Sequence, residues 1–299
     1  MTDPMTLGFI GLGRMGGAMA SRLIATGNEL MVYDINPAAV SALVSAGATA
    51  ASNVPALADR CATVFLSLPT LESVLSTVLG RDGIVAGQSV RTVVDLSTSG
   101  PAIAVKLSDA LSERGIASID APVSGGIAGA RNGKLSLMVS GPEPAFEAVR
   151  PLLEVLGRIF FMGPAAGAGQ TMKLVNNLLG ACAIAITAEG MTIGLKAGLD
   201  PERMIEVLNA STGRNSATQD KWPRAVLPRT FDFGFASGLC LKDLRLCDDE
   251  ARELGVPLSI GRAVRALLER AVAKYGPESD FTVMTKVVEA DAGLDPERN

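Results

Sequence analysis

The chain has 299 residues, of which 48% are hydrophobic and only 4% aromatic, and its formal net charge is -4. This length suffices for one large domain and one smaller domain, whose cores must be filled mainly by leucine, valine, isoleucine and alanine. No run of like charges occurs. The composition therefore does not favour binding to nucleic acid or to an anionic membrane surface.

Histidine is absent from the sequence, which removes the commonest general base. Its absence also excludes Ser-His-Asp and Cys-His catalytic groups and almost every catalytic zinc site. The four cysteines, Cys61, Cys182, Cys240 and Cys247, are scattered and form no CxxC pair, so no disulfide framework and no metal site are expected. Proton transfer must then use lysine, aspartate, glutamate, tyrosine or a cofactor.

The first residues show no basic segment followed by an apolar run and a cleavage site, so a cytoplasmic location is expected. The most apolar long window covers residues 174–195. It contains Asn176, Asn177 and Glu189, which would be costly inside a bilayer. A buried helix is the preferred interpretation, and no membrane partner is predicted.

The first half of the chain alternates short apolar runs with stretches of helical length and period. The expected strands are residues 7–10, 30–33, 64–68, 92–94, 116–119, 135–139 and 159–161. The first expected helix follows the first strand and ends near residue 25. The other expected helices cover residues 37–45, 71–79, 103–114 and 144–156. This alternation predicts an α/β domain with a mainly parallel sheet covered by helices on both faces.

The pattern changes after about residue 163, where GPAAGAGQ forms a small-residue connector. One long helix is predicted over residues of roughly 171 to 197. The next helix is predicted to start with Asp200 as its N-cap and Pro201 at its first position. Further helical stretches are expected at residues 202–209, 239–254, 259–273 and 281–290, with no strand. We therefore predict two domains, an α/β domain over 1–165 and an all-helical domain over 166–299, joined by the long helix.

Three glycines, Gly11, Gly13 and Gly16, form a GxGxxG motif where the first expected strand meets the first expected helix. In such motifs the first glycine permits a tight turn, the second lets the backbone approach a pyrophosphate, and the third allows close helix packing. The free N–H groups of the helix start would face the phosphates. The motif predicts a Rossmann-type dinucleotide site, to which the loop also contributes Leu12, Arg14 and Met15.

Asp34 ends the second expected strand, at about the spacing where an acid binds the adenosine ribose in this type of site. A carboxylate at this position would repel the 2′-phosphate of NADP. We therefore expect NAD as the cofactor, with NADP disfavoured. The alternative is that Asp34 only caps the turn formed with Asn36 and Pro37.

Longer blocks of the chain resemble the β-hydroxyacid dehydrogenase family, which includes 3-hydroxyisobutyrate dehydrogenase, tartronate semialdehyde reductase and 6-phosphogluconate dehydrogenase. The resemblance covers essentially the whole length. The matching blocks are FIGLGRMGGAMA (9–20), SLPT (67–70), DLST (95–98), DAPVSGGIAGARNGKL (120–135), GQTMKLVNN (169–177) and CLKDLRL (240–246). The resemblance implies an NAD-dependent oxidoreductase that oxidises a small β-hydroxyacid to its semialdehyde, or catalyses the reverse reaction.

The resemblance also assigns further residues to the cofactor site. Leu68, Pro69 and Thr98 would lie at strand ends along the cofactor, with Ser73 as a weaker candidate. Lys242 would reach from the helical domain toward the cofactor. From spacing alone, Lys242 could instead be an ordinary residue on the surface of an amphipathic helix.

A substrate site is implied as well. By the resemblance, Ser124, Gly125 and Gly126 would hold the substrate carboxylate. Glycines between a strand and a helix offer free N–H groups that can bind an anion. A turn that needs flexible residues would also explain the glycines. By the resemblance, Lys173 is the catalytic residue and Asn177 its neighbour. The two residues are four apart, so both project from one face of the predicted helix.

The substrate itself stays open. Hydroxyisobutyrate enzymes tend to carry a tryptophan in the stretch that matches STGRNSAT, where this chain has Ser216. Tartronate semialdehyde reductase and a threonate-type sugar-acid dehydrogenase are therefore alternatives, and a non-catalytic NAD-binding regulator is an alternative of another class. An imine reductase would be expected to have replaced the lysine. A homodimer or homotetramer is expected, because the long apolar helix suits burial on more than one side.

Overall fold

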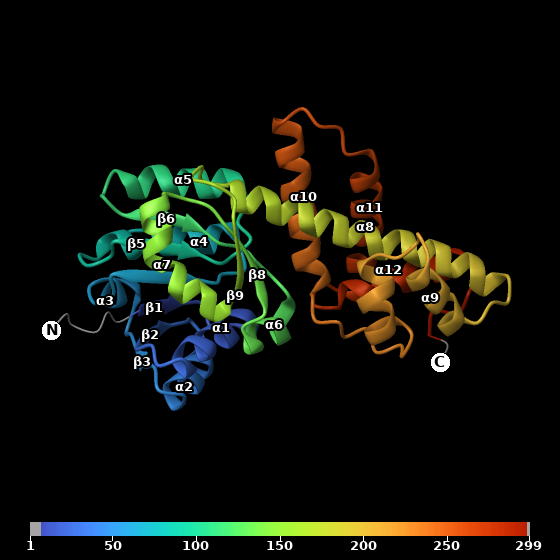
Figure 1. Cartoon of the computed structure of the whole chain (residues 1–299), viewed down its shortest axis with the longest axis horizontal. Coiled ribbons are helices and arrows are strands. Elements are labelled where there is room, and N and C mark those ends of the chain that lie inside the picture. The colour runs from blue at the N-terminus through green and yellow to red at the C-terminus, as the bar shows by residue number, and fades with distance from the viewer. Residues whose placement is uncertain (1–6, 298–299) are drawn as a thin grey trace. The chain divides into compact units, whose positions relative to one another are not determined.

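The computed structural model of the chain describes residues 7–297 (Figure 1). The chain divides into two compact units, Met1–Lys173 and Leu174–Asn299. The division falls inside helix α8 (Ala168–Lys196), whose first turns bond to the first unit and whose remainder belongs to the second. The predicted boundary at 165/166 lies a few residues before this helix.

The first unit is built around a six-stranded parallel sheet with the strand order β3-β2-β1-β4-β5-β6. Its strands are β1 (Leu7–Ile10), β2 (Leu30–Tyr33), β3 (Thr49–Ala50), β4 (Thr63–Leu66), β5 (Thr92–Asp95) and β6 (Ala117–Asp120). β1, β4 and β5 are buried along their whole length, as is typical of a parallel sheet covered on both faces. The predicted Rossmann-type sheet is confirmed.

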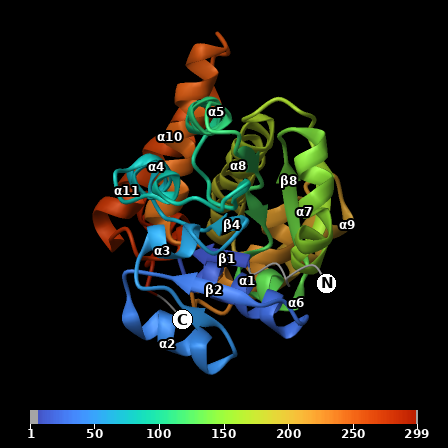
Figure 2. The same ribbon diagram turned by 90° about the vertical axis from the view of Figure 1, so that its left-hand side faces the viewer.

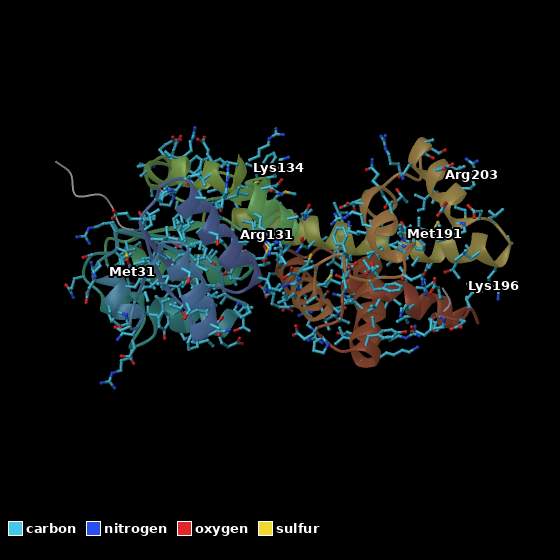
Figure 3. The ribbon with its side chains drawn as sticks, turned by 90° about the horizontal axis from the view of Figure 1, so that it is seen from below. Met31, Arg131, Lys134, Met191, Lys196 and Arg203 are labelled. Carbon is cyan, nitrogen blue, oxygen red and sulfur yellow. The ribbon has the colours of Figure 1, made fainter. Side chains whose placement is uncertain are left out.

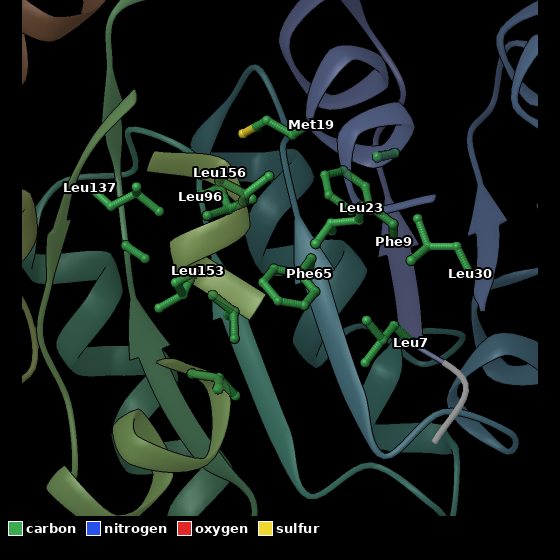
Figure 4. Close-up of a cluster of buried hydrophobic side chains, with 14 of the residues drawn as sticks. Leu7, Phe9, Met19, Leu23, Leu30, Phe65, Leu96, Leu137, Leu153 and Leu156 are labelled. Atoms are coloured by element: carbon green, nitrogen blue, oxygen red, sulfur yellow. The ribbon is translucent and has the colours of Figure 1, made fainter. Parts of the chain in front are cut away.

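Alternate side chains of the central strands fill two separate cores. Phe9 and Phe65 point into one core, where they lie in the cluster with Leu23 of α1 (Figure 4). Ile10 and Leu66, one residue further along each strand, belong to the other core, together with buried side chains of α3 (Val54–Ala58) and α4 (Leu71–Leu79). Figure 2 shows these two helices beside the sheet. The helices of this unit are α1 (Arg14–Ala25), α2 (Pro37–Ser45), α3 (Val54–Ala58), α4 (Leu71–Leu79), the short 3-10 helix η1 (Ile84–Ala86), α5 (Pro101–Ser112), α6 (Gly126–Asn132) and α7 (Glu143–Leu156).

The last strands of the first unit do not join the large sheet, contrary to the single sheet expected from the sequence. They form a separate three-stranded sheet of β7 (Val123–Ser124), β8 (Leu135–Val139) and β9 (Gly157–Phe161). β7 runs antiparallel to β8, and β8 runs parallel to β9. An isolated bridge between Asp120 and Ser140 connects this sheet to the end of β6.

The second unit is helical, and no strand occurs among its described residues, as predicted. Besides α8 it contains α9 (Pro201–Ala210), a π-helix η2 (Ala217–Val226), α10 (Ser237–Glu253), α11 (Ser259–Tyr275), the 3-10 helix η3 (Phe281–Val283) and α12 (Met284–Asp291). The π-helix was not anticipated. It contains Pro223, which lacks the N–H that an α-helix interior requires.

Helix α8 has 29 residues and a mean hydropathy of 1.7 in its most apolar window, so by length and composition it could cross a membrane. In that window 44% of the residues are buried within the protein, among them Ala181, Ile184 and Met191 in the core of the second unit. Figure 3 labels Met191 and also Lys196, whose ammonium donates to the carbonyl of Ala292. These contacts make α8 the central helix of a folded unit.

Candidate active site

The glycine-rich loop after β1 has the shape of a phosphate cradle. Gly11 has a φ of +90°, which favours glycine, and a Cβ on Gly16 would lie 1.9 Å from the carbonyl oxygen of Gly11. Around Gly13 the space is open, since nothing lies within 4 Å of the position that a Cβ would take. Gly13 also precedes α1 without a side-chain cap, so the first N–H groups of the helix can bind a pyrophosphate.

Asp34 lies next to this loop at the end of β2. Its Oδ2 accepts a hydrogen bond from the N–H of Leu12 at 2.5 Å, and its Oδ1 accepts one from the N–H of Asn36 at 2.7 Å. The carboxylate therefore caps the following turn and braces the glycine loop at once. The two roles considered for Asp34 are compatible, because its position beside the loop also suits the adenosine ribose of NAD.

The other residues expected along the cofactor follow β4 and β5 at the same edge of the sheet. The N–H of Leu68 donates to Oγ of Ser97 at 2.9 Å, which ties the loop after β4 to the loop that contains Thr98. Pro69 follows Leu68 in that loop. Ser73 instead forms a capping box with Thr70 at the start of α4, so its hydroxyl is engaged in stabilising the helix.

The segment expected to bind a carboxylate connects β7 to α6. Gly125 and Gly126 have φ values of +127° and +65°, so both adopt the backbone region that favours glycine. Nothing lies within 4 Å of a Cβ built on Gly126, so its backbone is accessible. Ser124 directly precedes these glycines in β7 and is half-buried.

A buried carboxylate that the sequence did not reveal holds the start of α8. Asp120 accepts hydrogen bonds from the N–H of Gly167 on Oδ1 and from the N–H of Gln170 on Oδ2, at 3.0 and 3.1 Å. Its Oδ2 also accepts a hydrogen bond from Oγ of Ser140 at 2.7 Å. Lys173 follows in the next turn of α8, with 8% of its surface exposed.

Asn177 lies one helical turn beyond Lys173, and in the second unit it bonds to α10. Its Nδ2 donates to Oδ2 of Asp243 at 2.6 Å, and its Oδ1 accepts from Nδ2 of Asn176 at 3.1 Å. Asp243 is 3% exposed and pairs through Oδ1 with the ammonium of Lys242 at 3.3 Å. The structure thus groups Asn177 with Lys242 through Asp243, a residue whose role no sequence pattern indicates.

Within the described range 7–297, no group of three or more aspartate, glutamate or cysteine side chains is arranged to hold a metal ion. The first unit offers a buried lysine and a dinucleotide cradle, and the second unit offers an oriented amide. Hydride transfer to a nicotinamide with proton transfer by the protein requires groups of these kinds.

Comparison with known proteins gives the class of this chain. Residues 6–163 match the NAD-binding domain of 6-phosphogluconate dehydrogenase, and residues 167–288 match the NAD-binding domain of NADP-dependent 3-hydroxyisobutyrate dehydrogenase. A 2-(hydroxymethyl)glutarate dehydrogenase from Eubacterium barkeri is 36% identical over 98% of both chains. From Pseudomonas aeruginosa, an NAD-dependent L-serine dehydrogenase is 38% identical over 96% of this chain and 99% of its own, and a 3-hydroxyisobutyrate dehydrogenase is 38% identical over 89% and 87%.

Solved structures agree. The 3-hydroxyisobutyrate dehydrogenase of Mycobacterium tuberculosis, determined with L-serine, superposes with a TM-score of 0.86 at 28% identity and covers 96% of this chain and 99% of its own. A Streptomyces aurantiacus imine reductase at 23% identity, with a TM-score of 0.65, shares the fold alone. The chain belongs to the β-hydroxyacid dehydrogenase family. It is an NAD-dependent oxidoreductase that acts on small hydroxyacids, as predicted.

The position of Asp34 generates a test of cofactor choice. Asp34→Asn keeps the size of the side chain and an acceptor for the N–H of Leu12, but removes the charge that opposes a 2′-phosphate. We expect the ratio of kcat/KM for NAD to that for NADP to fall by at least about tenfold, equivalent to ~1.4 kcal/mol. Steady-state kinetics with both cofactors measure it, with Asp109→Asn on the surface of α5 as the control. An unchanged ratio would show that Asp34 does not set the preference.

Proposed function

We propose that the enzyme oxidises hydroxyacids of the form HOCH2–CHX–COO⁻ to the corresponding semialdehydes, and reduces them in reverse, with Lys173 as the proton-transfer group. The substrates named for the three relatives share this core. The substituent X is a methyl group in 3-hydroxyisobutyrate, a carboxyethyl group in 2-(hydroxymethyl)glutarate and an ammonium in L-serine. The observation that carries the proposal is the burial of Lys173 at the start of α8, in a protein without histidine.

In the direction of oxidation, Nζ of Lys173 accepts the proton of the substrate hydroxyl, while a hydride leaves the carbon that bears this hydroxyl. The glycine loop and Asp34 would hold NAD, which would supply the hydride acceptor. In reduction, the protonated amine returns the proton to the carbonyl oxygen. Burial suits this role, because a side chain that is largely removed from solvent can act on a bound substrate without competition from water.

Asn177 and the segment 124–126 are proposed to orient the substrate. One N–H of the Asn177 amide is fixed on Asp243, which leaves its second N–H in a defined direction for a substrate oxygen. The backbone N–H groups around Gly125 and Gly126, with the hydroxyl of Ser124, would bind the carboxylate. Lys242, compensated by Asp243, is proposed to act on the cofactor side.

Lys173→Ala tests the proton-transfer role. A general acid–base group contributes about 10²–10⁴-fold, so kcat should fall by at least about 10²-fold, while the Kd for NAD measured by calorimetry stays within about twofold. Lys173→Arg should not restore activity, because a guanidinium does not deprotonate near neutral pH. Lys196→Ala, near the other end of α8, is the matched control. More than about a tenth of wild-type kcat in Lys173→Ala would assign the proton transfer to another group.

Lys221, in the π-helix of the second unit, is our candidate for binding a polar or anionic substituent X. Its ammonium donates to the carbonyl and the hydroxyl of Ser216, at 3.3 and 3.0 Å, and lies 5.5 Å from the ring centre of Phe233. Burial lowers the pKa of Lys221, and the nearby Asp220 raises it. A charge on Cys240 would also raise the pKa of Lys221, and Cys240 precedes Asp243 by one turn of α10. We propose that Lys221 binds the substituent.

A substrate panel tests this proposal. We expect the wild-type enzyme to oxidise 2-(hydroxymethyl)glutarate or glycerate with a higher kcat/KM than 3-hydroxyisobutyrate or L-serine. Lys221→Met removes the charge and keeps the length of the side chain, so it should lower kcat/KM for the preferred acid by at least about tenfold, as expected for the loss of a charged hydrogen bond. The value for 3-hydroxyisobutyrate should stay within about threefold. Lys274→Met is the control, and equal losses for all four acids would contradict the assignment.

We further propose that the enzyme is a cytoplasmic homodimer or homotetramer in which α8 contributes to the contact. Apolar side chains with large exposed fractions recur along this helix, at Val175 (41%), Leu179 (63%), Ile186 (62%) and Ile193 (72%). Their spacings of four and seven residues place them along one stripe of the helix. Exposed apolar patches of this kind mark protein interfaces.

Ile186→Glu should disrupt this contact. A charge in the centre of an apolar interface is costly to bury. We therefore expect the Kd of the assembly to rise by at least about tenfold in the variant. Sedimentation velocity over a micromolar concentration series measures it. Val105→Glu, at a partly exposed apolar position of α5, serves as the control. A wild-type protein that sediments as a monomer at micromolar concentration would refute the proposed assembly.

A further inference from the structure

The side chain of Gln170 connects the helix that carries Lys173 to the loop after β5. Gln170 is fully buried. Its Oε1 accepts hydrogen bonds from the N–H groups of Ser99 and Gly100, both at 3.1 Å. Its Nε2 donates to the carbonyl of Ser97 at 3.0 Å. One amide group thus satisfies three backbone groups of the loop that contains Thr98, one of the residues proposed to lie along the cofactor.

This loop is also held from the sheet side. Asp95, the last residue of β5, accepts hydrogen bonds from the N–H of Ser97 at 2.9 Å and from the hydroxyl of Ser99 at 2.8 Å. The hydroxyl of Ser97 accepts the N–H of Leu68 at 2.9 Å. The loops after β4 and β5, which both face the cofactor side, are therefore fixed to each other and to Gln170.

The backbone of Gln170 is fixed as well. Asp120 accepts its N–H, and Oγ of Ser140 accepts the N–H of Gly169 at 2.8 Å. A Cβ on Gly169 would lie 2.3 Å from the carbonyl oxygen of Met138 and 2.8 Å from Oδ2 of Asp120, so the helix start fits closely against β8 and β6. Movement of the first turn of α8 would break several buried hydrogen bonds at once.

We propose that Gln170 is a positioning residue that sets the place of Lys173 relative to the cofactor-side loop Ser97–Gly100. The inference rests on the proposed role of Lys173 in proton transfer. Residues three apart on a helix are surface neighbours, so a shift of Gln170 is transmitted to Lys173. A misplacement of about 1 Å between reacting groups costs on the order of 10²-fold in rate. The amide accepts two N–H groups and donates to a carbonyl from this position, whereas an ionised carboxylate can only accept.

Gln170→Met tests the proposal, because it keeps the length and approximate volume of the side chain and removes all three hydrogen bonds. With the acid that the wild-type enzyme oxidises fastest among the four of the panel, we expect kcat to fall by at least about tenfold. The Kd for NAD should stay within about twofold. The deuterium isotope effect on kcat, with the substrate deuterated at its hydroxymethyl carbon, should rise because hydride transfer becomes slower. In the enzyme without cofactor, hydrogen exchange should accelerate in peptides that contain Ser99 and Gly100.

Two further variants separate positioning from loss of stability. Leu111→Ala removes a fully buried side chain of α5 in the same unit. It should lower Tm at least as much as Gln170→Met does, while its kcat stays within about twofold of the wild-type value. If Gln170→Met does not fold, Gln170→Glu retains the two acceptor bonds and loses the donor, and a smaller but distinct fall in kcat is expected.

The outcomes distinguish this inference from the proposed function. Wild-type kcat in a folded Gln170→Met or Gln170→Glu enzyme, with Lys173→Ala inactive, overturns the positioning role and leaves Lys173 in place. A fall in kcat that Leu111→Ala reproduces at equal loss of Tm overturns it too. An active Lys173→Ala enzyme removes the proposed function and the inference together.

Discussion

The carboxylate of Asp120 is the constraint on which the rest of the site depends. It joins the end of β6, the end of β8 and the first turn of α8, by hydrogen bonds to Ser140, Gly167 and Gln170. A carboxylate at a helix N-terminus also interacts favourably with the helix dipole. Burial raises the pKa of Asp120, and the hydrogen bonds from these three partners lower it. The same group that starts α8 therefore fixes the helix that carries the proposed catalytic lysine against the dinucleotide-binding sheet.

The two proposed functions of the first unit, cofactor binding and placement of the lysine, use the same edge of one sheet. Parallel strands bring their carboxyl ends together, so loops that are distant in sequence meet there. Asp95 and Asp120 lie side by side in register at that edge. Asp95 accepts hydrogen bonds from the loop after β5, and Asp120 accepts them from the start of α8. Gln170 connects these two segments. The edge acts as a single polar framework, which accounts for the burial of so many polar groups beneath one helix end.

Much of this architecture follows from local patterns in the sequence. Period-two and period-3.6 patterns located most of the strands and helices, and the spacing of Gly11, Gly13 and Gly16 identified the phosphate loop. The patterns could not show that β7, β8 and β9 form their own sheet, because strand pairing is not a local property. The π-helix around Pro223 was missed for a similar reason, since a proline normally ends a helix. The roles of Asp120, Gln170 and Asp243 depend on partners 50, 70 and 66 residues away, which no spacing rule reveals.

Helix α8 contains several glycines, and their surroundings differ sharply. At Gly169 the neighbouring strand and the Asp120 carboxylate leave no room for even a methyl group, whereas Gly180 and Gly190 have open space beside them. Glycine within a helix costs about 0.5–1 kcal/mol relative to alanine, so the two open positions could accept alanine with a gain in helix stability. Sequence drift along α8 should accordingly be uneven. The end that holds the lysine is closed to change at Gly169, whereas Gly180 and Gly190 can accept a larger residue as the enzyme adapts to other temperatures.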